Sequence, residues 1–135
     1  MNGRTRISLI AVALGAVALL VAGSSAEATN TIQTPSKISI KSSGIDFSGK
    51  VTSNSYPPCR QSRKVNLFRV ISGGPDQKMG SDTTNAHGKW AISPSGFAGI
   101  SMAHFYAKVK RSSQGAAGTI YVCKAAKSAT IKPSS

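Results

Sequence analysis

Apolar and polar residues alternate over most of the chain after residue 36. The alternation is clearest in residues 37–41, 45–52 and 104–110, where apolar side chains occupy nearly every second position. Successive side chains of a β-strand point to opposite faces, so a period of two predicts strands with one buried face. Turn-forming residues separate these segments at intervals of about ten residues. The pattern predicts an all-β fold, an antiparallel sandwich of roughly seven or eight strands.

The expected strands differ in how deeply they are buried. Residues 64–71 end in Phe68, Val70 and Ile71, which are apolar on both sides of the strand and indicate a central position. In chain order the expected strands are 37–41, 45–52, 64–71, a short edge strand around 78–79, 89–93, 104–110, 119–124 and 129–132. Loops or turns are expected at 53–62, 72–76, 94–103 and 111–118.

The stretch 84–92 combines a tight turn with the only tryptophan of the chain. Asn85 and Gly88 are residue types that tolerate a positive φ and suit a turn. Trp90 and Ile92 then alternate with polar or small residues, so both are expected to face inward. We therefore predict that Trp90 is buried and anchors the strand in the core.

The first 28 residues have the pattern of a secretory signal helix. Arg4 and Arg6 precede an apolar run, and Ala26-Glu27-Ala28 offers small residues at the two positions that signal peptidase reads. We expect cleavage after Ala28, with cleavage after Ala26 or an uncleaved membrane anchor as alternatives. The expected organisation is a signal peptide over 1–28, a flexible leader over 29–36, a sandwich domain over 37–132 and a tail over 133–135.

The chain is strongly basic, with a formal net charge of +13. Without residues 1–28, which hold two arginines and one glutamate, 15 basic and three acidic residues remain and the net charge is +12. Such an excess attracts polyanions such as acidic polysaccharides, although it also serves solubility alone. Nucleic acid is not an expected partner, because no recognition motif for it is present.

The two cysteines, Cys59 and Cys123, both lie in the part expected to be exported. An even count outside the cytosol favours a disulfide, which on the chain-entropy model stabilises a loop of this length by about 4 kcal/mol. Metal binding by the pair is the alternative, but neither cysteine has a Cys or His at ligand spacing. We expect no metal and no cofactor.

The residue inventory argues against catalysis. His87 and His104 are the only candidate bases, and Asp46, Asp76 and Asp82 are the only acids after residue 28. No serine lies in a nucleophile-elbow setting, and three scattered aspartates make a poor source of paired carboxylates. We expect a protein that is not an enzyme and has no catalytic residues.

The outward positions of the expected strands are rich in lysine. Tyr106 lies among them, and an aromatic ring beside cations is suited to hold a charged polymer. The candidate polyanion-binding residues are Lys37, Lys41, Lys50, Lys64, Tyr106, Lys108 and Lys110, with Lys132 also outward. The alternative is a solvated face that protects sheet edges from aggregation.

The order of these motifs resembles that of a known class. The motifs are Phe47-Ser48-Gly49-Lys50-Val51, Arg63-Lys64-Val65-Asn66-Leu67, Thr84-Asn85-Ala86-His87-Gly88-Lys89-Trp90 and Phe105-Tyr106-Ala107-Lys108-Val109. Cys59 lies between the first two motifs. Cys123 comes after the last motif and is followed by Ala126-Lys127-Ser128. Together they resemble the carboxypeptidase-regulatory-like, or transthyretin-like (prealbumin-like), modules of secreted bacterial proteins, which are immunoglobulin-like sandwiches. The resemblance covers most of 37–132 and implies a stalk, adhesive or accessory module.

The turn departs from that class at Asn85 and His87, where the family usually carries aspartate. A cation site is therefore not expected there. The function expected from the sequence is that of a secreted, monomeric, non-enzymatic sandwich that binds an anionic cell-surface polymer or another secreted protein through a basic face. The alternatives are a purely structural or accessory protein, and a cationic effector such as an antimicrobial or an inhibitor.

Overall fold

The computed structural model describes residues 30–54, 57–94 and 102–133. The expected signal peptide and its cleavage after Ala28 lie outside these residues and remain predictions. No helix of the described part is long and apolar enough to cross a membrane.

The described residues form an all-β structure, as the alternation predicts. The elements are β1 (Asn30–Thr34), β2 (Ser36–Ile38), β3 (Lys41–Ser43), β4 (Asp46–Ser53), the 3-10 turn η1 (Pro57–Cys59), β5 (Lys64–Arg69), β6 (Gln77–Thr83), β7 (Lys89–Ile92), β8 (Phe105–Val109), β9 (Ser112–Ala116), β10 (Thr119–Cys123) and β11 (Ala126–Lys127).

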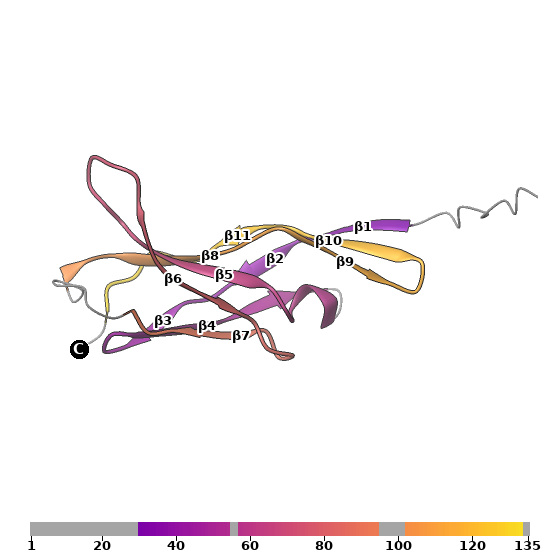
Figure 1. Ribbon diagram of the computed structural model, residues 1–135, viewed down its shortest axis with the longest axis horizontal. Helices are drawn as coiled ribbons and strands as arrows, with labels where there is room; N and C mark the ends of the chain where they lie inside the picture. The colour runs from indigo at the N-terminus through magenta and orange to yellow at the C-terminus, as the bar shows by residue number, and fades with distance from the viewer. Residues whose placement is uncertain (1–29, 55–56, 95–101, 134–135) are drawn as a thin grey trace, which may run out of the picture.

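Two layers make up the sandwich (Figure 1). One is the antiparallel sheet β11-β8-β5-β6. In the other, β4 pairs with β7 on one edge and with β2 and β3 on its opposite edge. A three-stranded ribbon, in which β10 pairs in parallel with β1 and antiparallel with β9, extends beyond the sandwich. The antiparallel β-sandwich expected from the sequence is therefore confirmed.

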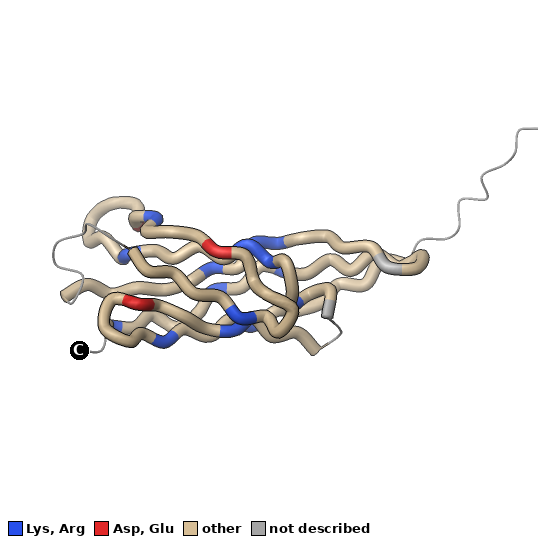
Figure 2. The backbone as a smooth tube through the Cα atoms, turned by 60° about the horizontal axis from the view of Figure 1, so that its bottom comes forward, with Lys and Arg blue, Asp and Glu red and all other residues tan. Residues whose placement is uncertain are grey.

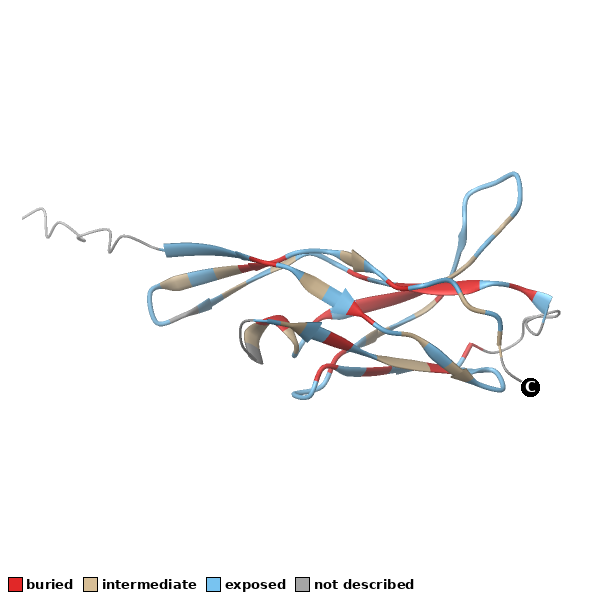
Figure 3. Ribbon diagram, turned by 180° about the vertical axis from the view of Figure 1, so that it is seen from behind, coloured by how far each residue is buried: buried red, intermediate tan, exposed pale blue. Residues whose placement is uncertain are grey.

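The core lies between the two layers, where inward residues of both sheets meet (Figure 3). The rings of Phe47 from β4 and Phe105 from β8 lie 4.7 Å apart between centroids. The other buried members include Ile38, Val51, Val65, Leu67, Met79, Trp90, Ile92, Ala107 and Val109. Trp90 is only 2% exposed, which confirms its predicted burial.

A close backbone approach explains the glycine opposite Trp90. Gly49 pairs with Trp90 across β4 and β7. A Cβ on Gly49 would overlap the carbonyl oxygen of Ser39 and would lie 2.8 Å from Nε1 of Trp90. Glycine is needed at this position because no larger residue leaves room for the indole and the neighbouring strand.

Two segments expected to be irregular are strands. The leader expected over 29–36 instead contains β1 and the start of β2, because β10 supplies a partner for a polar sequence with little pattern of its own. The loop expected over 111–118 contains β9, which joins β10 through a two-residue turn. Ala117 and Gly118 both have a positive φ, 46° and 81°, the geometry that suits a tight hairpin.

The end of the domain also differs from expectation. A strand was expected over 129–132, but β11 lies earlier, at Ala126–Lys127, and Ile131 makes only an isolated bridge with Phe105. The edge strand expected around 78–79 is longer and spans β6. The strand expected over 37–41 is interrupted at Ser39, whose hydroxyl accepts a 3.0 Å bond from the amide of Lys50.

Cys59 and Cys123 form the expected disulfide. The bond ties η1 to the end of β10 across 64 positions of sequence, and both cysteines are fully buried. It fixes the ribbon of β1, β9 and β10 to the loop that connects the two layers.

Arg63 lies beside the disulfide and has no exposed surface. Its Nη1 donates to the carbonyl of Cys59 at 2.7 Å and to the hydroxyl of Ser36 at 3.0 Å. Its Nη2 donates to the carbonyls of Lys110 at 2.9 Å and Lys124 at 3.0 Å, with a longer contact to Cys123. All these acceptors are uncharged, and burial lowers the pKa of Arg63. One guanidinium therefore joins β2, η1 and the ends of β8 and β10.

Replacing Arg63 with lysine should destabilise the fold by more than about 3 kcal/mol. A lysine cannot reach the same acceptors, and each buried acceptor left unpaired costs about 1–3 kcal/mol. Urea unfolding with the disulfide intact measures the change, with the exposed Arg111→Lys as the matched control. Equal stability of Arg63→Lys and the wild type would contradict this role for the guanidinium.

Replacing Trp90 with alanine should lower the free energy of unfolding by about 3–5 kcal/mol, because it empties a large buried volume between the layers. The same urea titration, followed by circular dichroism because the tryptophan is lost, measures it. The exposed neighbour offers a control, since Ala91→Ser should change stability by less than about 0.5 kcal/mol.

Candidate anion-binding faces

The lysines expected on a single basic face lie on two opposite faces of the sandwich. Lys37, Lys41 and Lys50 belong to β2, β3 and β4, whereas Lys64 and Lys108 belong to β5 and β8 and Lys110 directly follows β8. Figure 2 shows basic residues on strands of both layers. The single face was wrong because alternation along a strand separates inward from outward positions but does not say which sheet the strand joins.

The first face covers the outside of the sheet β11-β8-β5-β6 and is called the Tyr106 face. Pairing aligns its residues in rows: Lys108 lies opposite both Asn66 and Lys127, and Phe68 lies opposite both Tyr106 and Lys78. Its cations, all exposed, are Lys64, Lys78, Lys108, Lys110 and Lys127. Lys78 and Lys127 were missing from the expected set, although their neighbours in the other strands carry the same outward parity.

The aromatic residues of this face form a packed base under the lysines. The rings of Phe68 and Tyr106 stack with centroids 5.4 Å apart. The ammonium of Lys127 lies 4.2 Å from the centre of the Tyr106 ring, and that of Lys108 lies 5.7 Å from the Phe68 ring. Tyr106 is only 4% exposed. Protein groups therefore cover the ring, which the sequence suggested as part of a polymer-binding surface, and leave little of it for a ligand to contact.

Asp76, in the loop between β5 and β6, is the carboxylate of this face. Tyr106 donates its hydroxyl to Asp76 at 2.6 Å, and the amide of Ile71 donates to the same carboxylate at 3.0 Å. These two bonds, with smaller effects of Lys127 and Lys108, lower the pKa of Asp76. Burial, together with the adjacent carboxylate, raises the pKa of Tyr106 to about 12. The carboxylate thus fastens the loop to the sheet.

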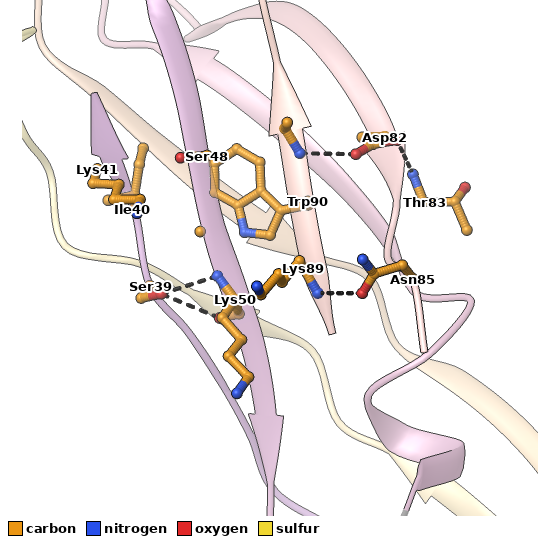
Figure 4. Close-up of a pocket in the computed structure, with 12 residues that line it drawn as sticks. Ser39, Ile40, Lys41, Ser48, Lys50, Asp82, Thr83, Asn85, Lys89 and Trp90 are labelled. Carbon is orange, nitrogen blue, oxygen red and sulfur yellow. Dashed lines mark hydrogen bonds between the residues drawn. The ribbon is translucent and has the colours of Figure 1, made fainter. Parts of the chain in front are cut away.

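The second face covers the outside of β2, β3, β4 and β7 and is called the β4 face. Its cations are Lys37, Lys41, Lys50 and Lys89, all exposed. A shallow hollow of about 660 Å³ lies on this side of the molecule, and its lining includes Lys41, Lys50, Lys89, Ser48 and Gly49 (Figure 4). Lys89 was missing from the expected set, although its alternation with Trp90 already marks it as outward.

The turn before β7 borders the hollow and uses Asn85 as its organising residue. The side-chain oxygen of Asn85 accepts from the amides of His87 at 2.9 Å and Lys89 at 3.0 Å. Gly88, at φ 77°, donates its amide to the carbonyl of Asn85. The side-chain oxygen of Asn85 therefore caps the turn.

The groups considered for catalysis are not brought together. His87 lies exposed in the turn before β7 and His104 lies exposed before β8. Neither imidazole is hydrogen-bonded within the described residues. Asp46 accepts from the hydroxyl of Ser93, while Asp82 accepts from the amides of Thr83 and Ala91. In the described part of the chain, no group of three or more His, Cys, Asp or Glu is placed to hold a metal ion.

Comparison with known proteins adds no relative. No protein-family model matches the sequence, and no curated protein and no solved structure matches it significantly. The resemblance to carboxypeptidase-regulatory-like modules therefore remains a prediction from short motifs.

An alkaline titration tests the contact between Tyr106 and Asp76. One of the three tyrosines should ionise near pH 12, well above the usual value of about 10. The stabilisation associated with the protonated hydroxyl is complete below the usual pKa and is lost as the pH rises through about 12. Tyrosinate absorbance measures the ionisation, and Tyr106→Phe should remove the late step.

Asp76→Asn should shift that late step to lower pH, because it removes the carboxylate that disfavours a neighbouring phenolate. The step should stay above the usual value, since burial is the larger cause. Ionisation of all tyrosines together near pH 10 in the wild type would contradict the assignment.

Proposed function

We propose that the mature chain is a secreted, non-enzymatic module that binds an anionic polymer of the cell surface through its Tyr106 face. The observation that carries the proposal is the set of five exposed lysines on one side of one sheet, where the carboxylate of Asp76 is already bonded to Tyr106 and Ile71. Sulfate, phosphate or carboxylate groups of a polymer are the complementary partners for such a surface.

The packing of the face favours binding. Lys108 and Lys127 rest on aromatic rings, so part of their motion is already restricted before a ligand arrives. Binding then loses less side-chain entropy than it would with freely moving lysines. Rigid strands, rather than loops, hold four of the five lysines at their positions.

The disulfide supports an extracellular location, since such bonds persist in oxidising compartments. With the signal pattern of residues 1–28, it is consistent with export. A membership of the carboxypeptidase-regulatory-like class, with its adhesive and accessory modules, fits the same function and remains part of the proposal.

Chromatography on immobilised heparin tests the proposal. The wild-type domain should be retained at low salt and elute as salt approaches ~0.5 M, because added ions screen exposed charges. The triple variant Lys64→Gln/Lys108→Gln/Lys127→Gln should elute at clearly lower salt.

A matched control removes the same charge from positions outside the strands of both faces, in Arg111→Gln/Lys124→Gln/Lys132→Gln. This control should elute later than the Tyr106-face variant. Passage of the wild type through the column at low salt would contradict polymer binding, and equal elution of the two triple variants would contradict the choice of face.

A further inference from the structure

The β4 face carries a second concentration of lysine, on the side of the sandwich opposite the Tyr106 face. The two faces belong to different sheets, and the hydrophobic core lies between them. A ligand on one face therefore leaves the other face open.

Strand pairing forces two lysines of the β4 face together. Lys50 of β4 lies directly opposite Lys89 of β7. The neighbouring residues Val51 and Gly88 are joined by a 2.8 Å backbone bond, so Lys50 and Lys89 form a non-hydrogen-bonded pair. That type of pair brings side chains closest, and like charges placed so are destabilising. An anion between the two ammonium groups would relieve this repulsion.

Small residues leave room for such an anion. Ser48 and Ala91 lie opposite each other in the next outward row, and Lys41 pairs with Ser48 from the other side. Together with Gly49 they line the hollow of about 660 Å³, which is large enough for one or two sugar units. Lys41, Lys50 and Lys89, from three strands, all belong to this lining (Figure 4).

The carboxylates near the hollow are engaged by protein donors. Asp82, which is part of the lining, accepts from the amides of Ala91 and Thr83, each at 2.8 Å. Asp46, farther along β4, accepts from the hydroxyl of Ser93 at 2.7 Å. Neither forms an ion pair with Lys41, Lys50 or Lys89 within the described residues. The lining holds three lysines against the one carboxylate of Asp82, so the hollow keeps an excess of positive charge for a ligand.

We propose that the hollow of the β4 face is a second binding site, for a sulfated, phosphorylated or carboxylated sugar unit, and that the protein bridges two anionic polysaccharide chains. The bridging rests on the proposed function of the Tyr106 face, whereas the hollow is a separate site. Two sites on opposite faces of a rigid sandwich join separate chains and raise the avidity for a surface dense in such chains.

A two-step capture experiment tests the bridge. Heparin is immobilised sparsely, the disulfide-intact domain is bound at low salt, and fluorescent heparin is then added. We expect the wild type to capture the second chain. Two triple variants remove equal charge from opposite faces. They are Lys41→Gln/Lys50→Gln/Lys89→Gln on the β4 face and Lys64→Gln/Lys108→Gln/Lys127→Gln on the Tyr106 face. Each should still bind the immobilised chain but capture about tenfold less of the second chain per bound molecule.

The control Arg111→Gln/Lys124→Gln/Lys132→Gln should capture the second chain as the wild type does.

The outcomes separate the two proposals. Full capture by the β4-face variant would overturn the hollow as a site. A wild type that binds the first chain but captures no second chain would overturn the bridge and leave the Tyr106 face as the single site. A wild type that binds no heparin at low salt would overturn the proposed function and the bridge together.

Discussion

The position of Arg63 determines how the separate parts of this sandwich are joined. A buried cation normally loses far more hydration than neutral partners return, and burial indeed lowers the pKa of this one. Here the planar guanidinium donates to carbonyls of η1 and β10 and to carbonyls of the residues that follow β8 and β10. These contacts lie beside the disulfide. Only arginine offers that geometry while staying charged. The ribbon and both layers therefore depend on one side chain whose charge is balanced by dipoles rather than by a carboxylate.

The shortage of carboxylates, which leaves Arg63 with uncharged partners, also determines the charge of the surface. The chain after residue 28 has only three acids, and in the structure each of them accepts hydrogen bonds, Asp76 and Asp82 from backbone amides and Asp46 from a serine. Three carboxylates cannot balance the 15 basic residues of that part of the chain. Self-repulsion consequently weakens the folded state, and the disulfide and Arg63 offset it from within. A polyanion that binds the folded surface, as proposed, would stabilise it further by mass action.

Sequence reasoning reached the fold through features that depend on neighbouring residues alone. The alternation placed most strands, a solitary tryptophan after a turn was buried as expected, and two cysteines formed the expected disulfide. β1 and β9 were missed because their polar and small residues become strands only through pairing with β10. Nothing in the sequence indicated that Arg63 is buried, since an arginine next to a strand has the same sequence context whether it is buried or exposed. The covering of Tyr106 was missed because Phe68 and Asp76 reach it from elsewhere in the chain.

The two lysine faces follow from the topology more than from either strand alone. A sandwich whose strands all alternate must place its outward residues on two opposite surfaces, so a lysine-rich alternating sequence produces two basic faces. The faces nevertheless differ in construction. On the Tyr106 face aromatic rings support the lysines, whereas on the β4 face short residues leave a depression between them. A packed surface suits contact along an extended chain, and a depression suits a single charged unit. In the proposed function, the two sides would therefore hold different parts of an anionic polymer rather than repeat one site.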